Sequence, residues 1–330
     1  MTQKLRAGFL GTGSYLPEKI VTNKDLEKIV DTADEWIVTR TGIKERRMAA
    51  PDQTTSDMAT EAAKKAIHNA GLKTSDLDLI IVATITADMP TPSTACQVQS
   101  KLGALQAAAF DVSAACSGFV YGLTIAKAFV ESGTYKNILL IGAEKLSAFV
   151  DWKDRTTCVL FGDGAGAAII GPVAEGQHEI LSAYMAANGN EADLLKIPGG
   201  GCKLPASSES VEQGMHFLKM QGKEVFKIGV KVMSEAILEA VRRANISLEE
   251  VSIVVPHQAN KRIIQAIGDR LNISPDKIFI NVDKVGNTSA ASLIIALDEA
   301  IQTGVIKKGQ YVALVAFGAG TTLASSVVKW

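Results

Sequence analysis

The chain carries the same arrangement of residues twice, at a constant distance along the sequence. Thr86 follows the apolar run LIIVAT and His257 follows the apolar run VSIVVP, and 257 − 86 = 171. Cys116 and Asn287 each stand before a long stretch with few charged residues, and 287 − 116 = 171 as well. Two anchor pairs at one offset indicate an internal duplication, and a repeat of this size dictates the architecture of the whole chain.

The ends of those two stretches keep the same offset. Gly133 closes the first stretch and Gly304 closes the second, and 304 − 133 = 171. Glycine commonly terminates helices, so both stretches are predicted to be helices of equivalent length. We therefore expect two related halves, residues 1–173 and 174–330, with the cysteine of the first half facing the asparagine of the second.

The distribution of apolar residues predicts an α/β protein. Short apolar runs without polar alternation are typical of strands covered on both faces. Such runs lie at residues 79–84, 137–143, 251–256 and 311–318. Helical stretches at 56–71 and 231–245 alternate with them, which predicts mostly parallel strands. The duplicated helices, 117–133 and 288–304, are apolar nearly all round, so we expect them to lie between two sheets with other helices outside.

Composition and charge exclude several classes of function. Hydrophobic residues make up 47% of the chain and charged residues 21%, as in globular proteins. The net charge of −1 and the aromatic content of 5% argue against a nucleic-acid partner, which needs a basic surface and stacking side chains. No apolar run reaches the ~18 residues of a membrane span, and the first residues turn glycine-rich too early for a signal peptide. We expect a cytoplasmic protein that does not enter the membrane.

The four cysteines form no metal or disulfide pattern. None belongs to a C-x-x-C pair or has a histidine at ligand spacing, so we expect neither a structural zinc nor disulfides. Cys96, in a predicted helix, and Cys158, in an apolar run interpreted as a strand, are taken to be structural. Cys116 differs because it stands between a strand and a helix start, where N–H groups and the helix dipole stabilise a thiolate. It is the candidate nucleophile.

His257 and Asn287 are the candidate partners of Cys116. His257 ends a predicted strand, and the carboxyl ends of strands are where open sheets bind ligands. Asn287 stands at the start of the second duplicated helix, where an asparagine is often no more than a cap. Its position as the counterpart of Cys116 favours a role in a shared site.

Glycine-rich stretches suggest a nucleotide site but do not complete one. GTGSYLP (11–17) and FGDGAGA (161–167) both depart from G-x-G-x-x-G, so we interpret them as close backbone packing. FGAG (317–320) follows a predicted strand, and its N–H groups could face an active-site oxygen. Arg46 and Arg47, in the basic run RTGIKERR, are interpreted as part of a solvated loop.

Four motifs, by their order and spacing, resemble those of the β-ketoacyl-ACP synthase III family of the thiolase superfamily (ACP is acyl carrier protein): DVSAACSGF, FGDGAGA, VVPHQANKRI and VGNTSAAS. The similarity spans essentially the whole chain, including DEWIVTRTGIKERR (34–47) and AFGAGTTLASSVVKW (316–330). The resemblance implies a thiolase-like α/β fold, in which duplicated halves form a five-layer αβαβα sandwich. It also implies an acyltransferase that initiates type II fatty-acid synthesis.

The resemblance implies the reaction and the site. An acyl-CoA primer, commonly acetyl-CoA, condenses with malonyl-ACP to give β-ketoacyl-ACP, CO₂ and free CoA, by a ping-pong route through an acyl-cysteine. Cys116 would be the nucleophile, and His257 and Asn287 would hydrogen-bond the enolate oxygen. The N–H groups of Cys116 and of Gly318–Ala319 would hold the later oxyanion. No metal or redox cofactor is needed, because the thioesters are themselves the substrates.

Substrate contacts also follow from the resemblance. Trp36 and Arg155 would sandwich the adenine of CoA, Arg40 would meet a CoA phosphate, and Asn260 would line the same site. ACP is acidic, so a basic docking surface is expected, with Lys227, Lys261 and Arg262 as its members. Family analogy suggests a homodimer. The segment ITADMPTPST (85–94) borders the expected acyl pocket and lacks the phenylalanine often found there, so the length and branching of the primer stay open.

Two other functions remain as alternatives. A relative on the same fold could transfer acyl groups without condensing them, or condense other partners in secondary metabolism. The presence of both His257 and Asn287 argues against pure transfer, since decarboxylation is the step that needs both. A non-catalytic acyl-CoA or ACP binding protein is the second alternative, and the intact Cys-His-Asn set argues against it.

Overall fold

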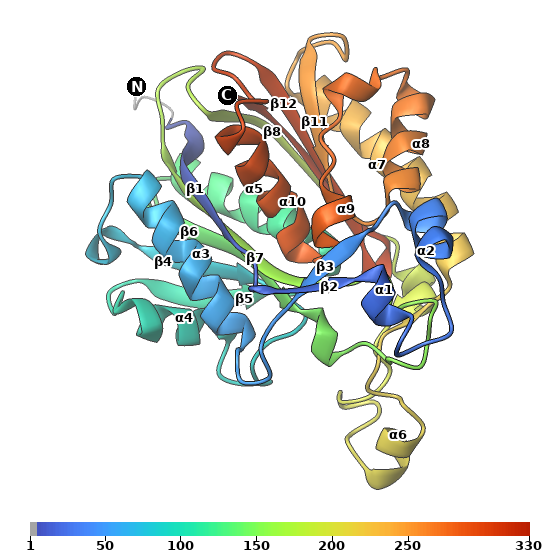
Figure 1. The fold of residues 1–330 in the computed structure, drawn as a ribbon. Coiled ribbons are helices and arrows are strands. Elements are labelled where there is room, and N and C mark those ends of the chain that lie inside the picture. The colour runs from blue at the N-terminus through green and yellow to red at the C-terminus, as the bar shows by residue number, and fades with distance from the viewer. Residues whose placement is uncertain (1–4) are drawn as a thin grey trace.

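Two helices with few charged residues form the centre of the molecule. The computed structural model describes residues 5–330, and α5 (Gly118–Glu131) and α10 (Ala290–Gln302) make up its central layer (Figure 1). Their side chains, among them Phe119 and Leu293, build the core between two arrays of strands. This position explains why both helices can be apolar nearly all round. Within residues 5–330, no helix is long and apolar enough to cross a membrane.

Strands lie on both sides of the central helices, and further helices cover the strands. The first array contains β1 (Ala7–Tyr15), β4 (Leu79–Ala83), β5 (Ala108–Val112), β6 (Ile138–Lys145) and β7 (Asp163–Pro172). The second contains β8 (Glu179–Ala186), β11 (Val251–Pro256), β12 (Tyr311–Gly318) and β13 (Thr322–Lys329). The outer helices are α3 (Thr55–Asn69) and α4 (Thr94–Leu102) on the first array, and α7 (Gly222–Arg243) and α8 (Lys261–Leu271) on the second. The five layers implied by the resemblance are confirmed.

The pairing of the strands corrects two details of the prediction. In the described part of the chain, both arrays belong to one nine-stranded sheet, β11-β12-β13-β8-β1-β7-β6-β4-β5, because Gly8 of β1 pairs with Glu179 of β8. The strands are not mostly parallel, since β4 with β5, β4 with β6 and β11 with β12 are parallel and the other neighbours are antiparallel. An apolar run indicates burial on both faces, and it does not report strand direction.

The offset of 171 recurs in the backbone. Both central helices end at a left-handed glycine, with φ of 74° at Gly133 and 71° at Gly304. In both, the N–H of the residue after the glycine donates to the carbonyl five positions earlier at 3.0 Å, which closes the helix as a Schellman motif. The counterpart of β5 in the second half is reduced to a short parallel bridge between Val254 and Ile278.

The glycine-rich stretches serve close packing, as predicted. A Cβ on Gly13 would lie 2.6 Å from the backbone N of Ala66 on α3, and one on Gly162 would lie 2.5 Å from the carbonyl oxygen of Val285. Real Cβ atoms do not approach that closely. GTGSYLP therefore seats α3 on the sheet, and FGDGAGA brings the first half against the turn that carries Asn287.

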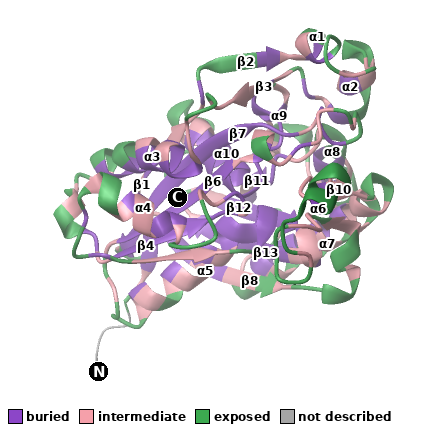
Figure 2. Cartoon of the chain, turned by 90° about the horizontal axis from the view of Figure 1, so that it is seen from below, coloured by how far each residue is buried: buried purple, intermediate pink, exposed green. Residues whose placement is uncertain are grey.

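The remaining segments gather around one end of the strands. They are β2 (Lys19–Thr22), α1 (Asn23–Leu26), α2 (Asp34–Thr41), β3 (Glu45–Met48), β9 (Leu195–Lys196), α6 (Ser208–Glu212), β10 (Lys219–Met220) and α9 (Val282–Val285). The segment with α6 projects from the body and is largely exposed (Figures 1 and 2). The bases of this projection, β9 and β10, pair with each other and contribute to the wall of the cavity described below.

Arg46 contradicts the interpretation of RTGIKERR as a solvated loop. Its side chain is 0% exposed. Nη1 donates to the carbonyl of Val21 at 3.2 Å and to Oδ1 of Asn23 at 2.8 Å, and Nη2 donates to the carbonyl of Val159 at 2.7 Å. Burial lowers the pKa of Arg46 to about 10. Arg47 is half-buried, so the solvated-loop interpretation fails for both residues.

Candidate active site

Cys116 lies in a short turn between β5 and α5. Ala115 has a φ of 46°, so the chain reverses direction just before the cysteine. The residue is 7% exposed. Burial raises the pKa of the Cys116 thiol to about 12, a hydrogen bond with Ser289 opposes this in part, and the charge of Glu144 adds to it. Burial thus opposes the stabilisation of a thiolate that is expected from the N–H groups and dipole of the helix end.

The two cysteines interpreted as structural are not part of the lining of the cavity. Cys158 is 0% exposed and occupies a turn rather than the predicted strand, and burial raises its pKa to about 11. Cys96 lies on α4 as predicted, half-buried, with Ser93 Oγ 3.2 Å from its sulfur. Neither lines the cavity that contains Cys116.

His257 follows β11 directly and is held at both its backbone and its ring. Its N–H donates to the carbonyl of Val315 on β12 at 2.7 Å, and Nδ1 lies 2.5 Å from Oγ of Ser292 on α10. The ring is 3% exposed, and burial lowers the pKa of His257 to about 3. The imidazole is therefore neutral at ordinary pH. With Nδ1 engaged, Nε2 is the nitrogen left for a ligand.

Asn287 is fixed by backbone pairing between the two halves. Gly286 has a φ of 67°, and the N–H and carbonyl of Asn287 pair with Leu160 O at 2.8 Å and Gly162 N at 3.0 Å. Its side-chain Oδ1 accepts the N–H of Ser289 at 2.8 Å. Since α10 begins only at Ala290, Asn287 does not cap it. The amide oxygen is occupied inside the protein, which leaves the two N–H bonds of Nδ2 for a ligand.

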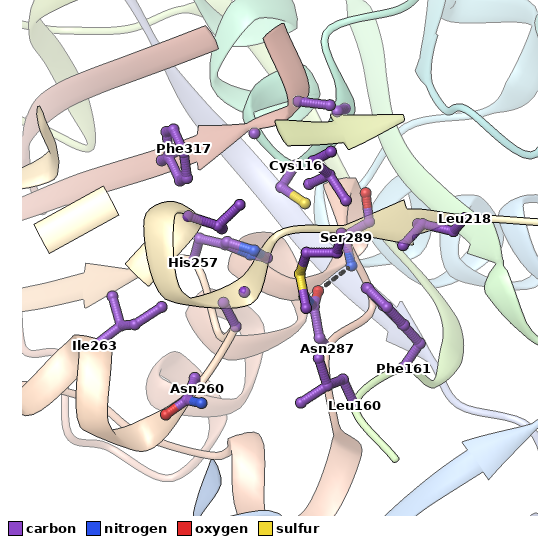
Figure 3. A pocket seen from close by; sticks show the side chains of 18 of the residues that line it. Cys116, Leu160, Phe161, Leu218, His257, Asn260, Ile263, Asn287, Ser289 and Phe317 are labelled. Atoms are coloured by element: carbon purple, nitrogen blue, oxygen red, sulfur yellow. Dashed lines mark hydrogen bonds between the residues drawn. The ribbon is translucent and has the colours of Figure 1, made fainter. Parts of the chain in front are cut away.

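The three side chains line one cavity, although they come from both halves. Cys116, His257 and Asn287 all border a cavity of about 980 Å³ whose lining is mostly apolar (Figure 3). Cys116 comes from the turn before α5, His257 from the end of β11 and Asn287 from the turn before α10. Within residues 5–330, no group of three or more His, Cys, Asp or Glu side chains is placed to hold a metal ion.

The glycine after β12 lies against the candidate nucleophile. A Cβ on Gly318 would stand 2.7 Å from the backbone N of Cys116. Gly318 and Ala319 both border the cavity. Only a residue without a side chain can bring β12 this close, so two backbone segments with N–H groups meet beside the thiol.

Two polar residues of the site were not predicted. Glu144, near the end of β6, is 0% exposed, and burial raises its pKa to about 7. Ser289 lines the cavity and donates its hydroxyl to Glu144 Oε1 at 3.0 Å. A signal for Glu144 existed, because an acidic residue at the carboxyl end of a parallel strand stands where ligands bind. Ser289 lies within VGNTSAAS, but sequence alone does not show what its hydroxyl contacts.

The candidate CoA residues gather at the mouth of the cavity. Trp36 and Arg40 on α2 and Asn260 at the start of α8 line it, whereas Arg155 does not. The guanidinium carbons of Arg40 and Arg155 lie 4.6 Å and 5.3 Å from the centre of the Trp36 ring. Arg155 thus covers the ring on which adenine was predicted to stack. The Asn260 side chain is also engaged, donating to the carbonyl of Arg40 at 3.0 Å and accepting from Arg262 N–H at 2.8 Å.

The candidate ACP residues lie at the same mouth. Lys227 on α7 and Arg262 on α8 line the cavity and are exposed, and the guanidinium of Arg262 lies 5.6 Å from the ring of Phe226. Lys261 is exposed but lies outside the lining, with its stem packed over Gly42. Only one acidic side chain pairs with them among the described residues, Glu224, at 3.6 Å from Lys227.

The neutral state of His257 predicts a pH-dependent stability. Its pKa falls from 6.5 to about 3 on folding, so between these values the unfolded chain binds the proton more tightly and stability is lost as the pH falls. Between pH 7 and pH 5 this group alone should lower the free energy of unfolding by about 2 kcal/mol. Urea unfolding at both pH values should show the wild type losing that much more than His257→Gln, whose side chain does not titrate. Equal losses would contradict a neutral, buried His257.

Sequence models of one family match two segments of the chain. The model described as 3-Oxoacyl-[acyl-carrier-protein (ACP)] synthase III matches residues 110–189, and the model of that family's C-terminal part matches residues 241–330. The first match contains Cys116, and the second contains His257 and Asn287.

Full-length relatives agree with these matches. The beta-ketoacyl-[acyl-carrier-protein] synthase III of Caldanaerobacter subterraneus subsp. tengcongensis is 60% identical over 330 residues, covering 100% of this chain and 99% of the relative. The crystal structure of 3-oxoacyl-[acyl-carrier-protein] synthase III from Aquifex aeolicus has a TM-score of 0.91 and 49% identity, covering 98% of this chain and 100% of that one. The priming β-ketosynthase of the R1128 polyketide pathway has a TM-score of 0.92 and 34% identity, covering 99% and 97%. The chain therefore has a thiolase-type fold and belongs to the β-ketoacyl-ACP synthase III family of condensing acyltransferases.

Proposed function

We propose that this protein condenses an acyl-CoA primer, acetyl-CoA above all, with malonyl-ACP and so initiates type II fatty-acid synthesis. The observation that carries the proposal is a single cavity lined by a thiol, a neutral imidazole and an amide whose oxygen is already bound. A nucleophile and two hydrogen-bond donors are what acylation and decarboxylation require. Neither step needs a metal or redox cofactor.

The first step acylates Cys116. The sulfur attacks the thioester carbon, the bond to the CoA sulfur breaks, and the thiol proton ends on free CoA. Burial makes the thiolate costly, so the proton has to leave as the new bond forms. His257, neutral and in the same cavity, is the base available to carry it.

The second step uses the hydrogen-bond donors. Malonyl-ACP loses CO₂, and the electron pair of the broken C–C bond passes into an enolate whose charge lies on the thioester oxygen. His257 Nε2 and Asn287 Nδ2 would donate to that oxygen, and one such donor is typically worth about 3–4 kcal/mol of barrier. The enolate carbon then attacks the acyl-cysteine, and collapse of the adduct expels the Cys116 sulfur, which takes up one proton from solvent and returns to the thiol.

The oxyanion of that second addition would be held by backbone N–H groups. The N–H of Cys116 and those of the Gly318–Ala319 segment are the candidates, because Gly318 packs directly against Cys116. The sequence has Ala319 where the commonest family pattern has a glycine. A backbone donor does not depend on that methyl group.

Primer binding would begin at the mouth of the cavity. Trp36, Arg40 and Asn260 would meet the nucleotide end of CoA. Arg155 would have to turn away from Trp36 and release its hydrogen bond to the carbonyl of Asp31, which measures 3.0 Å. That bond and the ion pair at 3.6 Å are solvent-exposed, so breaking them costs little.

ACP docking at Lys227, Lys261 and Arg262 predicts a selective defect. Arg262→Glu should raise the KM for malonyl-ACP about tenfold, because a like charge would face the acidic carrier. Acylation of Cys116 by acetyl-CoA should change much less. Steady-state kinetics against Arg270→Glu, the same change at the other end of α8, tests this. Equal KM values for malonyl-ACP in the two variants would show that Arg262 is not part of the docking surface.

The assembly and location belong to the same proposal. We expect a homodimer, and β5 supports it as the exposed edge of the nine-stranded sheet, where a second copy could pair. Sedimentation of a monomer at micromolar concentration would contradict the proposed dimer.

We also propose that residues 1–173 and 174–330 are the two duplicated halves, and that the enzyme acts in the cytoplasm with ACP. Fractionation of cells with an antibody would test the location.

The decisive assay combines the protein with acetyl-CoA and malonyl-ACP. Acetoacetyl-ACP and an acetylated Cys116, read by mass spectrometry, are the expected products. No product together with an unmodified Cys116 would reject the proposal. The likeness to a priming polyketide synthase favours one alternative, a priming role in secondary metabolism, and a scan of acetyl-, butyryl- and branched acyl-CoA primers separates the two.

A further inference from the structure

The buried carboxylate of Glu144 has hydroxyl and amide partners and no cation. It accepts from Thr86 Oγ1 at 2.7 Å, from Ser289 Oγ at 3.0 Å, and from Thr84 Oγ1 and Ile85 N at 3.2 Å. Among the residues that the structure describes, no lysine or arginine forms an ion pair with it. Burying an ionisable group without a counter-ion lowers stability, and the raised pKa of Glu144 reflects that cost. Its presence beside the thiol calls for a role in the site.

The carboxylate reaches the second half of the molecule through Ser289. This residue has a φ of 46° and a ψ of −121°, a backbone conformation that side-chain-bearing residues rarely adopt. Its hydroxyl is bound by Glu144, and its N–H donates to Oδ1 of Asn287 at 2.8 Å. The bond to Glu144 therefore holds the strained residue whose N–H decides which end of the Asn287 amide faces the cavity.

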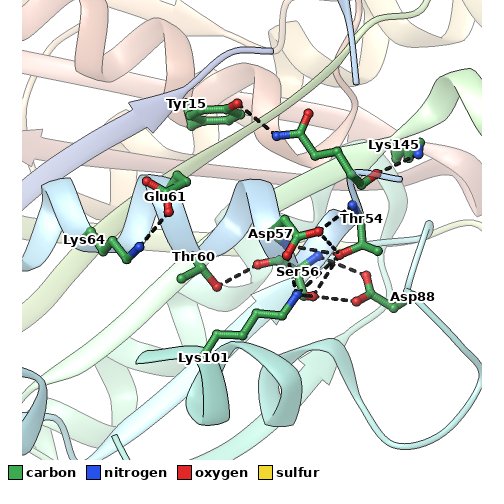
Figure 4. Close-up of polar contacts among 11 residues, drawn as sticks. Tyr15, Thr54, Ser56, Asp57, Thr60, Glu61, Lys64, Asp88, Lys101 and Lys145 are labelled. Atoms are coloured by element: carbon green, nitrogen blue, oxygen red, sulfur yellow. Dashed lines mark hydrogen bonds and ion pairs between the residues drawn. The ribbon is translucent and has the colours of Figure 1, made fainter. Parts of the chain in front are cut away.

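The other side of Glu144 is anchored to the first half. Thr86 Oγ1 donates to the carboxylate and accepts the N–H of Lys145 at 2.8 Å. The side chain of Lys145, labelled in Figure 4, donates instead to the carbonyls of Gln53 at 2.6 Å and Ala50 at 3.0 Å. Thr86 is the duplication's counterpart of His257. The position that carries the imidazole in one half thus supports the carboxylate in the other.

We propose that Glu144 is a positioning residue: through Ser289 it fixes the Asn287 amide so that Nδ2 faces the enolate oxygen. Without that anchor the turn can relax and the amide can rotate, which would present Oδ1 to a developing negative charge. Acylation of Cys116 does not use the Asn287 amide. The loss should therefore fall on decarboxylation. This inference rests on the roles proposed above for Cys116 and Asn287.

The test measures the two half-reactions separately. Glu144→Gln keeps the shape of the side chain but turns an amide N–H₂ group toward hydroxyls that now donate to the carboxylate. Ser289→Ala removes the hydroxyl that donates to Glu144 Oε1. Each variant should slow decarboxylation of malonyl-ACP about 100-fold. Ser289 also hydrogen-bonds the Cys116 thiol, and the charge of Glu144 raises its pKa, so the readout is the ratio of the two rates: decarboxylation should fall at least about tenfold more than acetylation of Cys116 by acetyl-CoA. If Glu144 acts through Ser289, the double variant should lose little more than the worse single variant.

Asp298→Asn is the matched control. Asp298 is also a buried carboxylate, 1% exposed, and accepts from Thr12 Oγ1 at 2.8 Å and Ser14 Oγ at 2.6 Å, but it lies outside the cavity. The Asp298→Asn variant should have a lower melting temperature than the wild type and the same ratio of the two half-reaction rates.

Equal losses in both half-reactions for Glu144→Gln and Ser289→Ala, or no loss in either, would overturn the positioning role alone. A wild type that performs neither half-reaction would overturn the proposed function and this inference with it. If Glu144→Gln does not fold, Ser289→Ala decides.

Discussion

Cys116→Ala is expected to abolish condensation while leaving malonyl-ACP decarboxylation within about tenfold of the wild-type rate. Without the sulfur no acyl-enzyme can form, and loss of the nucleophile from such a set typically lowers turnover by about 10⁴-fold or more. The donors proposed for the enolate, His257 and Asn287, stay in place. Release of CO₂ from malonyl-ACP, measured beside the yield of β-ketoacyl-ACP, separates the two activities.

Cys158→Ala is the control for that experiment. Both cysteines are buried and both have raised pKa values, but Cys158 lies outside the cavity lining. We expect it to lower stability and to keep both activities. Condensation retained by Cys116→Ala, or an acyl group found on another residue of that variant, would contradict the assignment of the nucleophile.

Much of this fold could be predicted because the chain repeats itself. The offset of 171 located both central helices, and the structure ends them at equivalent left-handed glycines, Gly133 and Gly304. The apolar runs located β4, β6, β11 and β12 to within a few residues. Strand direction was predicted poorly, because the antiparallel strands β7 and β13 are nearly as buried as the parallel strand β4, and only the connections between strands decide their direction.

The electrostatic character of the site could not be predicted from spacing. A cysteine at a helix start predicts a thiolate, yet burial by segments distant in sequence raises the pKa of Cys116. Arg46 illustrates the same limit: acceptors from Val21, Asn23 and Val159 converge on it only in the folded chain. Local patterns show which residues are candidates. Desolvation and long-range hydrogen bonds determine their protonation and orientation.

Asn287→Asp should produce the largest selective defect in decarboxylation. The aspartate is nearly isosteric, so one carboxylate oxygen can still accept the Ser289 N–H that now binds Oδ1. The other oxygen would replace the Nδ2 donor and bring a negative charge to the enolate. Loss of one such donor typically lowers the rate 10²–10³-fold, and charge repulsion should carry the total beyond about 10³-fold. Acetylation of Cys116, measured by intact-protein mass spectrometry, should persist.

Asn287→Ala separates the two parts of that effect, since it removes the donor without adding charge. We expect its decarboxylation rate to lie between those of the wild type and Asn287→Asp, so that the gap between the two variants measures the repulsion. If Asn287→Asp and Asn287→Ala decarboxylate malonyl-ACP equally fast, no negative charge develops beside this residue. If both match the wild type, the enolate is held elsewhere, and the orientation imposed by Ser289 on the Asn287 amide is a structural feature without a part in the reaction.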